Sequence, residues 1–283
     1  MLTMPPIYYL IISLFLGSFI LTYIIIPRII DVVKYKRLMD HPNQRSSHIE
    51  EVPSLGGVAF YIVIVLGVYF VQLLGWDTND ISMVIIPGLL VLFIVGLKDD
   101  LVLVAPLTKI AAQLLAIAFV LSHPAFHIVN LHGFLGIQRI SLFISIPLVA
   151  FVMIVIINAF NLIDGIDGLA SIVAIVIFGI LGLLFYLIQR PYFMGISVLM
   201  IGCLLAFLRY NLSSAKKIFM GDTGSLIIGF LIACATVRLF AVPLSYLKSL
   251  PFQLENLPLV VLAILIVPFF DTTRVFTIRV LNK

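Results

Sequence analysis

The chain has 283 residues, of which 63% are hydrophobic and only 11% are charged. Soluble domains contain about 25% charged and 45–50% apolar residues. No compact soluble fold can hide so much apolar surface from water, and the same composition excludes a disordered chain. The excess of 17 Lys and Arg over 13 Asp and Glu is too small and too dispersed to indicate binding to nucleic acid. The composition therefore indicates an integral membrane protein.

Charged residues divide the chain into apolar intervals long enough to cross a bilayer. A spanning helix needs about 20 apolar residues, whereas the strands of a membrane barrel would be shorter and alternating. We therefore predict an all-α polytopic membrane protein, a single domain over residues 1–283 with about nine transmembrane helices. The predicted spans are 7–27, 54–74, 82–97, 108–122, 141–160, 169–188, 192–208, 225–241 and 256–270.

The loops between these spans predict the orientation of the chain. With the N-terminus outside, most Lys and Arg residues fall on one side, which the positive-inside rule assigns to the cytoplasm. The basic residues left outside are Arg139, Arg190, Arg238 and Lys248. The carboxylates left outside are Asp77, Asp80 and Glu255. Because carboxylates follow no strong sidedness rule, their gathering on the inner side needs a cause of its own.

Three acidic clusters lie at the predicted cytoplasmic ends of helices. They are GLKDDL (96–101), NAFNLIDGIDGLA (158–170) and FMGDTGS (219–225), and Asp271 joins them on the same side. Adjacent carboxylates repel each other unless a cation or a basic group lies nearby, and Mg²⁺ commonly binds through one or two carboxylates and substrate phosphates. Helix capping could explain any one cluster. Three clusters on one face predict a metal-assisted phosphate site.

Two basic features lie near these clusters. Lys109 is one turn inside a predicted span, where burying a lone ammonium costs on the order of a few kcal/mol, so it is a functional candidate that could pair with a lipid phosphate. Snorkelling to the headgroups is the alternative. Gln113 lies one turn further along the same face. The inner loop 40–57 carries Arg45 and His48, and its alternative role is a topology signal that contacts anionic lipid.

At this point the motifs, in this order and at these spacings, resemble a known family. The parts are the DHPN-R-xx-H loop with PSLGG, the KDD pair, Lys109 with Gln113, NAFNLIDGIDGLA, RYN with FMGDTGS, and PFFDTTRV. The sequence resembles the bacterial polyprenyl-phosphate N-acetylhexosamine-1-phosphate transferases of the glycosyltransferase 4 family. It is more similar to the undecaprenyl-phosphate GlcNAc-1-phosphate transferase branch than to the phospho-MurNAc-pentapeptide transferase branch.

The resemblance implies an enzyme of the bacterial cytoplasmic (inner) membrane with its active site at the cytoplasmic face. It would transfer N-acetylhexosamine 1-phosphate, with GlcNAc favoured, from a UDP-sugar to undecaprenyl phosphate and release UMP. This would be the first membrane step of a cell-surface glycan pathway. The implied cofactor is Mg²⁺, with Mn²⁺ as the alternative ion. The implied partners are the UDP-sugar, undecaprenyl phosphate and membrane lipid, with a homodimer left open.

The same resemblance assigns roles to the acidic residues. Asp222 matches the magnesium ligand that would hold the diphosphate, and Asp167 is the second expected metal ligand. Asp99 matches a carboxylate that acts either as a base or as a group that orients the phosphate, with Asp100 as its partner. Asp164 and Asp167 match the nucleotide and metal side of the site, and the resemblance implies a catalytic role for both.

The substrate-binding roles are implied in the same way. Lys109 would hold the acceptor phosphate, Asn161 matches the nucleotide-side loop, and Asn211 matches a polar residue near the uridine diphosphate. Arg274, together with Arg45 and His48, would contact the sugar or the diphosphate. These substrate contacts complete the site that the sequence predicts.

One departure from the family pattern lies at the end of the chain. In the GlcNAc branch a histidine-rich HIHH segment follows DTTRV, but no histidine follows His132 here and the sequence stops at Lys283. We therefore expect a C-terminally truncated sequence. A genuine end here would instead favour an inactive paralogue.

Two other functions compete with the transferase interpretation. A transporter would place its carboxylates near the bilayer midplane, in broken helices or repeats. A CDP-alcohol phosphotransferase would show a DG-xx-AR motif, which is absent. The sequence leaves the sugar and the surface polymer open.

Overall fold

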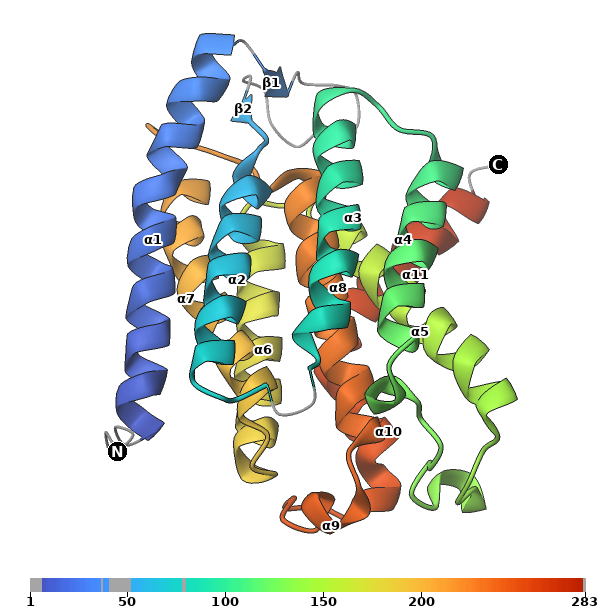
Figure 1. Cartoon of the computed structure of the whole chain (residues 1–283). Coiled ribbons are helices and arrows are strands. Elements are labelled where there is room, and N and C mark those ends of the chain that lie inside the picture. Colours follow the sequence, from blue (N-terminus) through green and yellow to red (C-terminus); the bar gives the residue numbers. More distant parts are fainter. Residues whose placement is uncertain (1–6, 37, 41–51, 78–79, 282–283) are drawn as a thin grey trace.

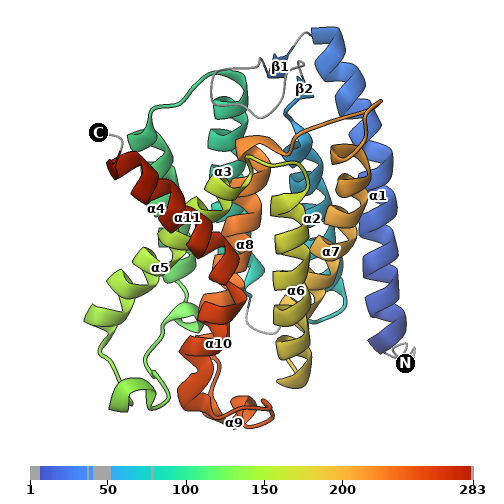
Figure 2. The same cartoon turned by 180° about the vertical axis from the view of Figure 1, so that it is seen from behind.

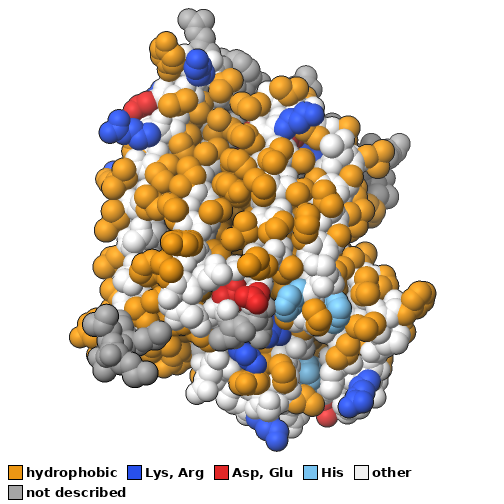
Figure 3. All heavy atoms as spheres, in the orientation of Figure 1, with side chains coloured by type: hydrophobic (Ala, Val, Ile, Leu, Met, Phe, Trp, Pro, Cys, Tyr) orange, Lys and Arg blue, Asp and Glu red, His pale blue; other side chains and the backbone are white. Residues whose placement is uncertain are grey.

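The computed structural model describes residues 7–36, 38–40, 52–77 and 80–281. Within these residues the chain is a bundle of helices, which confirms the all-α class (Figures 1 and 2). Seven of the described helices are long and apolar enough to cross a membrane, or eight if one bent pair counts as a single span. The face seen in Figure 3 is mostly hydrophobic across its middle, with Lys and Arg side chains toward its upper and lower ends. Such a surface fits a protein surrounded by lipid.

The element bounds follow the apolar runs of the sequence. The helices are α1 (Ile7–Lys36), α2 (Gly56–Leu73), α3 (Ser82–Leu101), α4 (Pro106–Leu121), α5 (Leu142–Ile163), α6 (Leu169–Leu187), α7 (Pro191–Asn211), α8 (Gly221–Ala241), α9 (Leu244–Leu247), α10 (Leu257–Ile264) and α11 (Ile266–Leu281). The strands are β1 (Met39–Asp40) and β2 (Val52–Pro53), which pair antiparallel. Pro106 and Pro191 open their helices at the first position, where the missing N–H costs nothing.

The last predicted span, 256–270, falls on two helices. It covers α10 and the first part of α11, which meet at Leu265 with a bend of 58°. Pro268 explains the break, because its ring lacks an N–H for the carbonyl of Ile264 and would clash with it in a regular helix. Figure 2 shows α11 running obliquely across the back of the bundle from this bend.

The predicted span 108–122 corresponds to α4, which has only 16 residues. A spanning helix needs about 17–25 residues, so the predicted number of nine spans is not reached by length alone. At the acidic ends the helices are longer than predicted. Helix α3 continues through Asp99 and Asp100 to Leu101, and α8 begins at Gly221 rather than at residue 225. Asp99, Asp100 and Asp222 therefore lie within helix ends, whereas Asp164 and Asp167 lie in the turn between α5 and α6.

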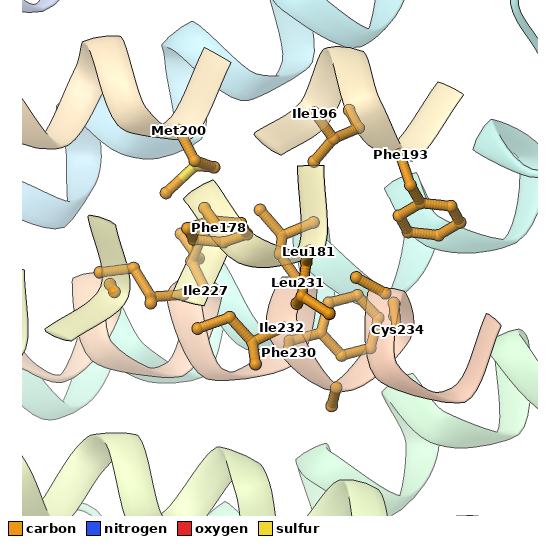
Figure 4. Close-up of a cluster of buried hydrophobic side chains, with 14 of the residues drawn as sticks. Phe178, Leu181, Phe193, Ile196, Met200, Ile227, Phe230, Leu231, Ile232 and Cys234 are labelled. Carbon is orange, nitrogen blue, oxygen red and sulfur yellow. The ribbon is translucent and has the colours of Figure 1, made fainter. Parts of the chain in front are cut away.

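Helix α8 is the centre of the bundle. It packs against α2, α3, α5 and α6, and nearly all of its residues are buried. Figure 4 shows part of this core, where Phe178 and Leu181 of α6 lie against Ile227 and Leu231 of α8. Helix α1, in contrast, packs mainly on α7 and leaves one side exposed. The central helix thus begins at the acidic end of the molecule and carries Asp222 in its first turn.

Glycines allow two helices to approach the start of α8 closely. A Cβ atom on Gly57 of α2 would lie 2.2 Å from the backbone nitrogen of Gly224, and one on Gly96 of α3 would lie 2.6 Å from Cα of Thr223. Neither contact is sterically allowed, so both positions require the absence of a side chain. The first turn of α8 is therefore held between α2 and α3 by direct backbone contact.

Backbone hydrogen bonds attach the segment before α2 to the segment before α8. Phe219 N donates to the carbonyl of Pro53 over 2.8 Å, and Gly56 N donates to the carbonyl of Phe219 over 2.9 Å. Gly57 N also donates to the carbonyl of Met220 over 2.8 Å. These three bonds form a short ladder between the two segments, so the PSLGG motif anchors the FMGD motif. Arg45 and His48, which come earlier in the same inner loop, lie outside the described residues.

The Gly57 contact predicts a specific loss of stability. Gly57→Ala should lower the free energy of unfolding by about 1–3 kcal/mol, because the added methyl group must displace backbone rather than a flexible side chain. The measurement is thermal unfolding of the purified protein in detergent.

Gly179→Ala is the matched control, because nothing lies within 4 Å of the corresponding Cβ on α6. It should unfold at the same temperature as the parent protein or higher, since Ala is the better helix former. Equal melting temperatures for Gly57→Ala and the control would contradict the close-packing argument.

Candidate active site

The acidic motifs meet at one end of the bundle, which is the upper end in Figure 1. Asp99 and Asp100 close α3, Asp164 follows the last residue of α5, and Asp222 opens α8. Helix α4 starts nearby and contributes Lys109. Residues far apart in the sequence thus share one end of the molecule. This agrees with the predicted topology, in which the acidic motifs all lie on the cytoplasmic side.

Asp100 binds the N-terminus of α8. Its carboxylate accepts hydrogen bonds from the backbone N–H of Asp222 over 2.6 Å and of Thr223 over 3.1 Å. The hydroxyl of Thr223 donates a third bond over 2.6 Å. The first N–H groups of a helix have no partner within the helix, and the positive end of its dipole favours an anion. Asp100 therefore acts as a cap for α8, supplied by another helix.

Gly221 makes room for this cap. Its φ angle is +69°, in the left-handed region, and a Cβ there would lie 2.6 Å from both carboxylate oxygens of Asp100. A side chain at this position would push the carboxylate away from the helix end. The glycine of MGDTGS is therefore needed for the contact between α3 and α8.

Lys109 lies between two carboxylates. Its Nζ is 2.7 Å from Oδ2 of Asp222 and also forms an ion pair with Asp99. Asp99 is itself oriented by the backbone N–H of Val104, which donates to it over 2.6 Å. The ammonium is thus directed into the acidic cluster rather than toward bulk headgroups. One cation shared by two carboxylates leaves the group with a net negative charge.

Asn161 completes the surroundings of Asp222. Its side-chain amide donates to Oδ1 of Asp222 and, over 3.0 Å, to Oγ of Ser225. One turn deeper in the membrane, Gln113 of α4 and Asn158 of α5 exchange hydrogen bonds of 3.3 and 2.8 Å. Both oxygens of the Asp222 carboxylate therefore have partners, one from α4 and one from α5.

Asp164 differs from the other carboxylates of the site. Among the described residues it has no hydrogen bond or ion pair. Burial raises its pKa well above the ordinary value, and the negative charges of Asp222, Asp100 and Asp167 raise the pKa further. A carboxylate with these neighbours is stabilised by any cation that approaches it. This is the physical basis for expecting a metal ion here.

The described residues do not enclose a metal on their own. Within them, no group of three or more His, Cys, Asp or Glu side chains is arranged to hold an ion. Asp222 is paired with Lys109, and Asp167 forms an ion pair with Lys217. The donors are nevertheless hard oxygens, and Mg²⁺ typically takes only one or two carboxylates with the remainder from phosphate and water. The residues fit such an ion when it arrives with a phosphate ligand.

Asn211 connects the two loops on the nucleotide side of the predicted site. Its side-chain oxygen accepts the N–H of Gly168 over 2.7 Å, and its amide donates to the carbonyl of Ile218 over 2.9 Å. The side chain is buried and both of its polar ends are used. Asn211 therefore holds the loop after α5 against the loop before α8, and the Asp167–Lys217 pair links the same two loops.

Arg274, the remaining described residue of the predicted site, pairs with a residue of its own helix rather than with the acidic cluster. Arg274 forms an ion pair of 2.9 Å with Asp271, one turn earlier on α11. Its side chain is more than half exposed, so it is free to reorient toward a ligand.

Several residues of the site were not predicted from the sequence. Thr223 and Ser225 were read only as parts of a motif, although their hydroxyls bind Asp100 and Asn161. Asn158 lies three residues before Asn161 in NAFN, and this helical spacing was the available signal. For Lys217, the sequence offered no indication of its pairing with Asp167 beyond the positive charge.

Comparison with known proteins gives the same family as the sequence motifs. The family model described as Glycosyl transferase family 4 matches residues 81–240. A Bacillus subtilis (strain 168) protein, named as a probable undecaprenyl-phosphate N-acetylglucosaminyl 1-phosphate transferase, is 30% identical over 267 residues, which are 93% of this chain and 70% of that protein. The phospho-N-acetylmuramoyl-pentapeptide-transferase of Staphylococcus haemolyticus (strain JCSC1435) is 29% identical over 252 residues. The match covers 78% of this chain and 74% of that protein.

The cap on α8 predicts that Asp100 and Asp99 differ in their effect on folding. Asp100→Asn should lower the free energy of unfolding by about 1–3 kcal/mol, because an amide cannot accept all three hydrogen bonds. Chemical or thermal unfolding in detergent measures this loss.

Asp99→Asn is the matched control. It should lower the free energy of unfolding by less than Asp100→Asn does, because Lys109 keeps its ion pair with Asp222. If the two variants lost equal stability, Asp100 would have no special role at the helix end.

Proposed function

The chain belongs to glycosyl transferase family 4 and is a multi-pass phosphotransferase of the bacterial cytoplasmic membrane, and on this premise we propose its reaction. It transfers N-acetylhexosamine 1-phosphate, with GlcNAc as the favoured sugar, from a UDP-sugar to undecaprenyl phosphate. An oxygen of the lipid phosphate forms a bond to the phosphorus that carries the sugar. The bond from that phosphorus to the bridging oxygen breaks, and UMP leaves with this oxygen.

The observation that carries the proposal is the position of Lys109 between Asp99 and Asp222. Both reactants are anions, so an approach without a cation between them is unfavourable. A lysine near the membrane interface is within reach of a phosphate on a lipid. In the proposed reaction the ammonium binds the acceptor phosphate, and Asp99 orients this contact through its own pairing with Lys109.

The attacking oxygen needs little help from a base. A phosphate monoester is already largely ionised near pH 7. Catalysis then depends on holding the two phosphates in line and on stabilising the charge that develops. For this reason we assign Asp99 to positioning, while Asp100 acts through the start of α8, on which Asp222 lies.

We propose that Mg²⁺ supports the donor diphosphate. Asp222 and Asp164 are the residues that would hold it, with Asp167 available once it leaves Lys217. When bound, the ion neutralises the diphosphate and the charge that develops on the leaving phosphate. Asn161 would keep Asp222 oriented toward the donor, and the loops tied by Asn211 would receive the nucleotide. Arg274, with Arg45 and His48, is proposed to contact the sugar or the diphosphate.

Removing the charge at Asp222 tests the assignment. Asp222→Asn should reduce UMP release from UDP-GlcNAc by at least about 100-fold, because a group that stabilises developing charge is lost. The assay uses membranes with undecaprenyl phosphate and Mg²⁺, and release in the parent protein should stop on chelation and return when Mg²⁺ is added back.

Glu255→Gln is the matched control, since it makes the same acid-to-amide change at the opposite end of the bundle and on an exposed residue. It should retain the parent turnover. Full activity in Asp222→Asn, at equal expression, would refute the assigned role of Asp222.

The identity of the sugar is a separate prediction. In competition among UDP-GlcNAc, UDP-GalNAc and UDP-glucose, UDP-GlcNAc should give the highest kcat/KM. UDP-glucose should be the poorest donor, because it lacks the acetamido group that would hydrogen-bond in the site. Radiolabelled lipid product, separated by chromatography, reports the preference. An equal kcat/KM for UDP-glucose would contradict the proposal that the transferred sugar is an N-acetylhexosamine.

A further inference from the structure

The pair of amides formed by Gln113 and Asn158 stands apart from the residues assigned so far. Gln113 is 1% exposed and lies on an otherwise apolar stretch of α4. Its Nε2 donates to Oδ1 of Asn158 over 3.3 Å, and Nδ2 of Asn158 donates to Oε1 of Gln113 over 2.8 Å. The same Nδ2 also donates to the carbonyl of Ile154 over 2.8 Å. The pair is thus reciprocal, and its geometry is fixed on both sides.

Such a pair constrains how α4 and α5 face each other. Water is scarce between transmembrane helices, so a buried amide finds its partner on a neighbouring helix or goes without one. Rotating or sliding α4 against α5 would separate both hydrogen bonds at once. An apolar contact of the same size would tolerate such a movement, because dispersion contacts are not directional.

The pair lies one helical turn from the two residues that hold Asp222. Lys109 precedes Gln113 by four residues on α4, and Asn161 follows Asn158 by three residues on α5, so each shares a face with its neighbour. Lys109 binds one oxygen of Asp222 and Asn161 binds the other. A contact that fixes α4 relative to α5 therefore also fixes the Lys109 ammonium relative to the Asn161 amide, on the two sides of the Asp222 carboxylate.

Helix α5 is attached directly to α8, whereas α4 is attached through its neighbours α3 and α5. A Cβ on Gly229 of α8 would lie 2.9 Å from Cα of Ile157, so the backbones of α5 and α8 are in close contact next to Asn158. Helix α4 packs on α3 and α5, and a Cβ on Gly88 of α3 would lie 3.1 Å from the carbonyl oxygen of Ala116 on α4. The Gln113–Asn158 pair adds a directional link between α4 and α5, and this link sets Lys109 relative to Asn161 across Asp222.

We propose that Gln113 and Asn158 are positioning residues, which set the register of α4 on α5 and so hold Lys109 at Asp222 where the acceptor phosphate binds. The inference rests on the proposed role of Lys109 toward that phosphate. Neither amide contacts substrate in this proposal. Both act through Lys109 and Asn161.

The first test measures the geometry without any turnover. A water-soluble carbodiimide joins an amine to a carboxylate only when the two are in contact, and the product is read by mass spectrometry. The parent protein should give Lys109–Asp222 crosslinks. Gln113→Leu, Asn158→Leu and the double leucine variant should lose most of them. The double variant has no unpaired buried amide, so it should fold.

The exchanged pair Gln113→Asn with Asn158→Gln provides the rescue. It keeps the total length of the two side chains, so the hydrogen bonds can form again and the crosslinks should return. Thr22→Val is the matched control, because it removes the buried Thr22–Cys203 hydrogen bond between α1 and α7, far from the site. Its crosslinks should equal those of the parent protein.

The second test is kinetic. The leucine variants should raise the KM for undecaprenyl phosphate about tenfold to a hundredfold, the range expected for a reacting group displaced by about 1 Å. Their KM for the UDP-sugar should change little, and the exchanged pair should recover the parent values.

Unchanged crosslinks in the leucine variants, or crosslinks that the exchanged pair fails to restore, would overturn the inference whatever the activity. A parent protein that crosslinks as expected but releases no UMP would instead refute the proposed reaction and leave the positioning role supported.

Discussion

The buried N-terminus of α8 is the constraint around which the acidic end of this protein is organised. A helix that begins inside a membrane protein must find partners for its first N–H groups, and water is not available to all of them. Asp100, on the neighbouring helix α3, accepts two of these N–H groups and also the hydroxyl of Thr223. The cap brings a carboxylate to the start of the central helix. It also fixes Asp222 within the first turn of α8.

Much of the site follows from this contact. Because α3 ends at the cap, Asp99 lies beside it and is available to Lys109. Because Gly57 and Gly96 allow α2 and α3 to touch the first turn of α8, the segment before α2 is joined by backbone hydrogen bonds to the segment before α8. The acids of two motifs therefore have different tasks. Asp100 stabilises a helix end, and Asp99 and Asp222 pair with Lys109.

The sequence alone predicted the helical class and the position of most spans, because long apolar runs in a membrane can only be helices or barrels. It also predicted that the acidic motifs share one end, since charge sidedness is visible in the loops. Helix bounds near Asp99 and Asp222 were missed because hydropathy falls where a helix continues into polar sequence. The bend at Leu265 was missed as well, although Pro268 was a local signal for it. Pairings such as Asp100 with the end of α8 depend on tertiary packing, which residue spacing does not encode.

The shortness of α4 has a consequence for the lipid substrate. Its 16 residues extend over about 24 Å, less than the roughly 30 Å of a hydrocarbon core. In Figure 1 α4 also begins well below the upper end of α3. The first turn of α4, which carries Lys109, is therefore recessed from the level at which α3 ends. A lipid phosphate at this depth keeps its hydrocarbon chain within the bilayer. Exposing that chain to water would cost about 0.8 kcal/mol for each CH₂ group, so the recess spares the acceptor a large desorption energy in the proposed reaction.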